Sequence, residues 1–101
     1  MEIRIKGKFE GSHQIPWIGE GFVFVDYLDE DIFLGNVFVL KDGTEICLQE
    51  IKIQFYSKEP ITMIGHGWKC LCRFDNLDLE QLSVVKDWFD KAPFIIATRK
   101  D

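Results

Sequence analysis

The chain has 101 residues, of which 47% are hydrophobic and 14% aromatic, enough apolar material for one ordinary domain with its own core. Its 17 acidic and 12 basic residues give a formal net charge of −5, which repels phosphate backbones and makes nucleic acid an unfavourable partner. No apolar run approaches the roughly 18 residues of a membrane span, and the N-terminal alternation of charged and apolar residues is not typical of a targeting segment. We expect one domain over residues 1–101, in the cytoplasm and without membrane contact.

The cysteines, Cys47, Cys70 and Cys72, indicate reduced thiols. An odd number does not suit a secreted disulfide framework. Cys70 and Cys72 would point to the same face of one strand, where a bridge between them would be strained. Reduced thiols agree with a cytoplasmic protein.

The first strand is expected at residues 2–9, where charged and apolar residues alternate with a period of two. Its wet face carries Arg4, Lys6 and Lys8. These cations form either a local basic patch or the solvated side of an edge strand. We favour the edge strand, because lysine there discourages aggregation.

Residues 10–19 are expected to form a loop, since Gly11, Ser12, Pro16 and Gly19 all break regular structure. The segment Ile15-Pro16-Trp17-Ile18 is unusually apolar for a connection. It is either a plug over one end of the core or a contact surface for a partner. The plug is favoured because monomeric proteins rarely leave such patches exposed.

The most apolar stretch, residues 19–40, predicts a β-hairpin. Phe22–Val25 is β-branched and aromatic throughout, which favours a strand. The acidic run at 29–31 is costly to bury, so the chain should reverse there at the surface. The return strand is expected over 32–40, with a bend at Gly35-Asn36.

Asp42-Gly43 predicts a tight turn into the next strand. In that strand the apolar residues Ile46 and Leu48 occupy even-numbered positions, whereas Ile51 and Ile53 occupy odd-numbered ones. A one-residue shift moves every side chain to the opposite face, so a β-bulge is expected near residues 49–50. Such strands are typical of small barrels and orthogonal sandwiches.

A short segment at 61–64 precedes a half-buried strand whose apolar face is expected to carry Trp68, Cys70, Cys72 and Phe74. The period then changes, which predicts a C-terminal helix over Leu79–Lys91.

The expected helix begins at Asp78, which forms a capping box with Gln81. Its inward stripe is Leu79, Leu82, Val85 and Phe89. It should end before Pro93. Residues 94–98 then form the last strand.

This order of elements resembles the second domain of elongation factor Tu and its relatives. The resemblance covers most of the chain. The segments that carry it are Gly19-Glu20-Gly21 before the apolar strand, Leu34-Gly35-Asn36, Asp42-Gly43, the isoleucine-containing strand 46–53, the glycine-led strand Gly67–Phe74, Asp78-Leu79 and the final strand 94–97.

The resemblance implies a six-stranded Greek-key-like barrel that contacts protein and RNA and is not a catalyst. The chain departs from the family pattern in having Glu20 in place of an arginine, Asn36 in place of an aspartate, and a longer segment after Leu79. It contains no G-x-x-x-x-G-K-[ST] motif, so the resemblance carries over neither GTP hydrolysis nor tRNA binding.

The sequence gives little support for catalysis or metal binding by the cysteines. A nucleophile would need Cys70 beside His66, but Cys70 is expected on the apolar face, where burial raises a thiol pKa. A zinc site from His66, Cys70 and Cys72 would rest on C-x-C spacing without a second pair. We expect no catalytic residue, no metal and no cofactor.

Four carboxylates, Asp26, Asp29, Glu30 and Asp31, cluster around the expected acidic turn. A hairpin tip in water offers none of the desolvation that acid–base catalysis needs, and no calcium-loop pattern is present. The cluster is either a solvated turn or an electrostatic docking site for a basic partner. Trp88, beside the inward stripe of the expected helix, is a second candidate contact because tryptophan is enriched at binding hot spots.

We therefore expect an all-β protein, a small barrel of six or seven strands with one C-terminal helix. Its expected function is that of a stand-alone, non-catalytic module that binds a protein partner. The alternative is an acidic immunity or inhibitor-type protein that masks a basic enzyme, and a small hydrolase using His66 with a cysteine ranks behind both. The candidate partner-binding residues are Trp17, Ile18, Asp29, Glu30, Asp31 and Trp88.

Overall fold

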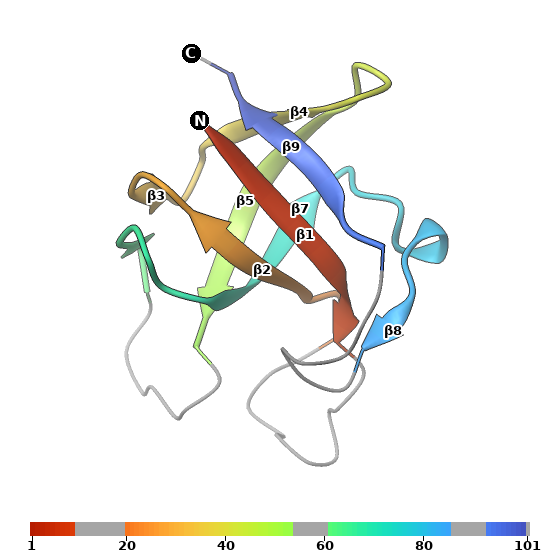
Figure 1. Ribbon diagram of the computed structural model, residues 1–101, viewed down its shortest axis with the longest axis horizontal. Coiled ribbons are helices and arrows are strands. Elements are labelled where there is room, and N and C mark those ends of the chain that lie inside the picture. Colours follow the sequence, from red (N-terminus) through yellow and green to blue (C-terminus); the bar gives the residue numbers. More distant parts are fainter. Residues whose placement is uncertain (10–19, 54–60, 86–92, 101) are drawn as a thin grey trace.

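The computed structural model describes residues 1–9, 20–53, 61–85 and 93–100. Strands dominate it and close into an antiparallel barrel (Figure 1). In order around the barrel, its six strands are β1 (Glu2–Phe9), β2 (Val23–Leu28), β7 (Cys70–Asp75), β5 (Glu45–Lys52), β4 (Val37–Leu40) and β9 (Ile95–Arg99), which pairs with β1.

The connections give the barrel a Greek-key topology. The barrel strands β4, β5 and β7 follow one another along the chain and pair in that order, and β9 returns across the barrel to pair with β4. The all-β barrel expected from the sequence is confirmed. Three short strands are attached to it: β3 (Ile32–Phe33) pairs with β6 (Met63–Ile64), and β8 (Val84–Val85) runs parallel to β1.

Inward-facing residues of every barrel strand fill the interior. Side chains exposed by 2% or less in this core are Ile3, Ile5, Val23, Val25, Ile32, Phe38, Ile46, Leu48, Ile51, Cys70, Cys72 and Ala97. A second, smaller cluster packs on the other face of β2 and β7 and contains Phe22, Phe24, Leu71 and Val85. Strand β7 is therefore buried on both faces, not half-buried as expected.

Two local features confirm the sequence analysis. The turn between β4 and β5 has Gly43 at φ +90°, and the Asp42 side chain accepts a hydrogen bond from the Thr44 backbone N–H at 2.9 Å. The change of apolar parity in β5 is a register shift against β7 between Leu48 and Glu50, the expected β-bulge.

The hairpin predicted over residues 19–40 is wrong. Strand β2 pairs with β1 and β7, β3 pairs with β6, and β4 pairs with β5 and β9. Gly35, at φ +89°, lets the chain turn away after β3, and its backbone N–H bonds to Leu48 O at 2.8 Å. The three apolar runs thus belong to different parts of the sheet system.

The edge-strand interpretation of β1 is also wrong. Barrel closure places β1 between β2 and β9, so its backbone is paired on both sides. The alternation itself is confirmed, because Ile3 and Ile5 are fully buried whereas Glu2 and Arg4 are exposed. Arg4 lies over the ring of Phe94, 5.0 Å from its centroid.

The start of the predicted C-terminal helix is wrong. Asp78 does act as a cap, accepting from the Glu80 N–H at 3.0 Å, but it begins only a 3₁₀ turn over Leu79–Gln81. The chain then forms β8, because two adjacent valines favour a strand and pair with β1. The rest of the expected helix, residues 86–91, lies outside the described residues. Within the described part of the chain, no helix is long and apolar enough to cross a membrane.

Replacing Gly7 with alanine is expected to lower the free energy of unfolding by about 1–3 kcal/mol. A Cβ atom at this position would lie 2.7 Å from the backbone oxygen of Ser83 and 3.0 Å from Val85 Cγ1, so β8 would have to move. Urea unfolding measures the change. The matched control is Gly65→Ala, whose Cβ would make only ordinary contacts of 3.6 Å or more. An equal effect of both substitutions would contradict the close packing of β8.

Candidate functional site

The acidic turn joins β2 to β3 at the surface, as the sequence predicts. Asp29 and Glu30 are exposed, and Ile32, two residues after Glu30, is fully buried. Asp26, grouped with these carboxylates in the sequence analysis, instead belongs to β2. Its Oδ1 atom is buried and has no hydrogen-bond partner among the residues that the structure describes.

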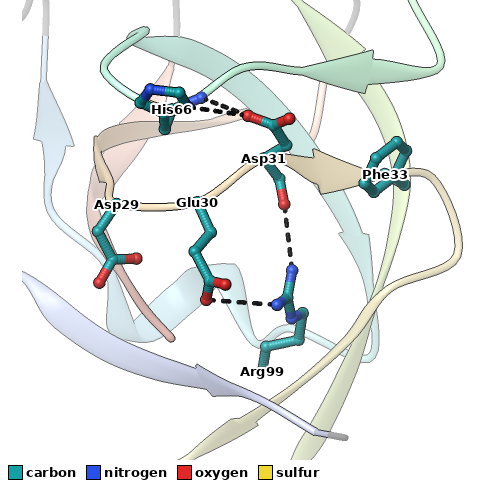
Figure 2. Close-up of a pocket in the computed structure, with 6 residues that line it drawn as sticks. All are labelled: Asp29, Glu30, Asp31, Phe33, His66 and Arg99. Carbon is teal, nitrogen blue, oxygen red and sulfur yellow. Dashed lines mark hydrogen bonds and ion pairs between the residues drawn. The ribbon is translucent and has the colours of Figure 1, made fainter.

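Hydrogen bonds connect the acidic turn with the turn between β6 and β7. Asp31 Oδ1 accepts a hydrogen bond from the His66 backbone N–H at 3.0 Å and lies 3.1 Å from His66 Nδ1 (Figure 2). The Gly67 N–H adds a bond to Leu28 O at 2.9 Å. We call the contact between Asp31 and His66 the Asp31–His66 clasp.

Arg99, at the end of β9, holds the same turn from the other side. Its Nη1 donates to the Asp31 backbone oxygen at 3.1 Å, and its Nη2 lies 3.3 Å from Glu30 Oε2. Figure 2 shows the Arg99 side chain beneath the turn, with both contacts. The acidic turn is therefore fixed by two segments distant in sequence.

These residues line an open surface depression of about 400 Å³: Asp29, Glu30, Asp31, Phe33, His66 and Arg99. The Asp29 carboxylate makes no hydrogen bond or ion pair with any described residue, and Figure 2 shows it away from the clasp. Three carboxylates against one guanidinium leave the depression negatively charged while His66 is neutral. It is suited to attract a basic group.

Apolar side chains continue this surface beyond the carboxylates. Phe33 on β3 is 48% exposed, and its register partner Met63 on β6 is 39% exposed. Residues directly opposite in an antiparallel pair share a face, so the two side chains lie side by side. Trp68 is 60% exposed, and a Cβ atom at Gly65 would lie 3.6 Å from Trp68 Cδ1 and 3.7 Å from Asp31 Oδ1. We define the acidic–aromatic face as Asp29, Glu30, Phe33, Met63, His66 and Trp68.

The exposure of Trp68 corrects the sequence analysis, which placed this residue on the apolar face of the strand. Strand β7 begins only at Cys70, and Trp68 belongs to the turn that starts at Gly65, with its N–H 3.3 Å from Gly65 O. The alternation of faces along β7 therefore does not extend to Trp68, because this residue lies before the strand begins.

Of the residues expected to bind a partner, the structure brings Asp29, Glu30 and Asp31 together on one surface. Trp17, Ile18 and Trp88, together with the apolar loop around Trp17, lie outside the described residues. Sequence reasoning did not place Phe33, His66 and Arg99 at this depression, nor Met63 and Trp68 on the acidic–aromatic face. A two-residue strand next to a turn gives too little alternation to reveal that Phe33 points outward.

The cysteines lie apart from this surface. Cys70 and Cys72 are fully buried in the barrel and are free thiols, as is Cys47. Burial, with Cys70 beside it, raises the pKa of the Cys72 thiol well above its ordinary value. Among the described residues, no group of three His, Cys, Asp or Glu side chains is placed to hold a metal ion.

A second depression, of about 350 Å³, lies on the barrel wall between β4 and β9 and is lined by Val39, Leu40, Lys41, Ile96 and Thr98. Ile96 is 45% exposed there. It lines no part of the acidic depression, so this wall provides control positions for the experiments below.

Asp31 is expected to titrate at a lower pH than an ordinary aspartate, because the His66 backbone N–H and then its imidazole bond to the carboxylate and lower its pKa. A lowered folded-state pKa means that these contacts stabilise the fold above the unfolded-state pKa and are lost as the pH falls through the folded one. Carbon-13 NMR of the Asp31 carboxyl measures the titration.

His66→Ala should return the Asp31 pKa only part of the way to its ordinary value, since the backbone N–H remains. Asp42, whose pKa is lowered by bonds from Thr44, is the internal control and should not move. An Asp31 titration unchanged by His66→Ala would contradict the clasp.

Comparison with known proteins adds no relative: no protein family, no curated protein and no solved structure matches this chain.

Proposed function

We propose that this protein is a stand-alone, non-catalytic module that binds a protein partner through the acidic–aromatic face. The observation that carries the proposal is that Phe33, an exposed apolar side chain, lines the same depression as Asp29 and Glu30 and has the exposed Met63 as its register partner. Partly exposed aromatic and methionine side chains supply binding energy at protein interfaces, whereas flanking charges supply specificity and association rate.

The partner that fits this face presents apolar side chains surrounded by basic ones. Asp29, Glu30 and the net charge of −5 attract such a surface over a distance. The fixed turn matters as well, because Arg99 and His66 hold it in place and little ordering is then needed on binding.

The resemblance to the second domain of elongation factor Tu supports the module as the first choice, since that domain contacts protein partners and the chain forms a Greek-key barrel. The burial of Cys70 and Cys72 supports a non-catalytic role, because neither thiol can meet a substrate there. Free thiols also support a cytoplasmic location.

The second candidate is an acidic immunity or inhibitor-type protein that masks a basic enzyme. The exposed carboxylates of Asp29 and Glu30 favour it. In that case charge would dominate association, and the on-rate would fall steeply with salt.

Affinity capture from a lysate of the source cell, at about 50 mM and about 500 mM salt, distinguishes these functions. A module that relies on Phe33 and Met63 should retain its partner at both concentrations, whereas an acidic inhibitor should release a basic protein at the higher one. The matched reference is the same column carrying Phe33→Ser and Met63→Ser. Equal retention by both columns at both salts would contradict docking through this face.

A further inference from the structure

We infer that His66 is a proton-dependent regulator of the acidic–aromatic face, which weakens the binding of a basic partner when its imidazole becomes charged. This inference rests on the proposed function, since it concerns the same face. The structural basis is the position of the ring, which lines the acidic depression and lies 3.1 Å from Asp31 Oδ1. The ring is also exposed, so protons reach it freely.

The charged groups around the imidazole come from three parts of the fold. Asp29, Glu30 and Asp31 belong to the β2–β3 turn, and Arg99 reaches the depression from β9. Lys69 follows on the segment that carries His66 itself. Between about pH 8 and about pH 5.5 the imidazole is the side chain that ordinarily changes charge, whereas carboxyl groups ordinarily titrate at about pH 4.

The direction of the effect follows from the clasp. With a neutral ring, the negative charge of Asp31 adds to that of Asp29 and Glu30 and attracts a partner's cation. A protonated ring forms an ion pair with Asp31 and adds a positive charge to the depression, as Arg99 already does beside Glu30. The lowered pKa of Asp31 keeps its carboxylate charged throughout this range.

A blocked tetra-arginine peptide is the test probe, titrated by NMR into the whole chain at low salt, at about pH 8 and at about pH 5.5. One added charge a few ångströms away should weaken binding about three- to fivefold at the lower pH. His66→Gln keeps the backbone N–H and a polar side chain but cannot become charged, so its affinity for the peptide should not depend on pH. The chain's other histidine, His13, is present in both proteins.

Each outcome decides a different claim. Weaker binding at low pH in the wild type alone supports regulation by His66. Binding that is independent of pH, or an equal pH dependence in His66→Gln, overturns the inference and leaves the proposed function standing. No binding at either pH counts against docking of basic partners on this face, and the inference fails with it.

Discussion

Phe38→Ala is expected to lower the free energy of unfolding by about 3–5 kcal/mol, the largest stability effect we predict for a single substitution. Phe38 lies in β4 with no exposed surface and meets Phe74 of β7 edge-to-face, with ring centroids 5.9 Å apart. The barrel interior is filled from all sides, so neighbouring strands cannot collapse into the space that a lost ring would leave.

A loss of this size is a large share of the roughly 5–15 kcal/mol that stabilises a typical domain. Urea unfolding followed by circular dichroism measures it. The matched control is Phe33→Ala, a change of the same residue type only one strand earlier, but at a side chain that is 48% exposed. It should cost no more than about 0.5 kcal/mol. Similar losses for the two variants would contradict the assignment of Phe38 to the core and Phe33 to the surface.

Phe33→Ser combined with Met63→Ser is expected to reduce partner binding at least about tenfold, the largest functional effect we predict. The two side chains are register partners on β3 and β6 and, with Trp68, form the apolar part of the acidic–aromatic face. Truncating both removes their apolar contacts and leaves Trp68 and the neighbouring charges in place. The retained amount of partner, quantified by mass spectrometry after the capture described above, is the readout.

The control for this double variant is Ile96→Ser. Ile96 is similarly exposed, at 45%, but lies on the barrel wall of β9 and not at the acidic depression. It should retain the partner as the wild type does. All variants should unfold at the wild-type urea concentration, which separates lost binding from lost structure. Equal retention by the double variant and Ile96→Ser would contradict the proposed face.

The sequence predicts the barrel largely through alternation and turn residues, which act locally. Ile3 and Ile5 identify the buried side of β1, and the parity change near residues 49–50 predicts the bulge that the structure contains. Pairing is a different matter, because it is decided between segments distant in the chain. The apolar runs of residues 19–40 resemble one hairpin, yet barrel closure gives each strand other neighbours.

The same reasoning explains why the start of the predicted helix is wrong. Leu79, Leu82 and Val85 have helical spacing, but Leu82 packs in the barrel core and Val85 in the second cluster. Pairing with β1 and packing in these two clusters outweigh the helical preference that the local spacing of apolar residues indicates. The candidate site shows the same difference between local pattern and long-range contact. The carboxylates of the acidic turn are adjacent in the sequence, whereas Arg99 and His66 are brought to them by the folding of distant segments.

Photo-crosslinking in the source cell tests the central claim, that the acidic–aromatic face is the docking surface, most directly. A benzoyl-phenylalanine replaces Phe33 in one variant and Phe94 in the other, two phenylalanines that are each 48% exposed. We expect a protein adduct from position 33 upon irradiation and none of the same mass from position 94, since the Phe94 ring lies against Arg4 on the barrel wall. No adduct from position 33, or the same adduct from both positions, would contradict it.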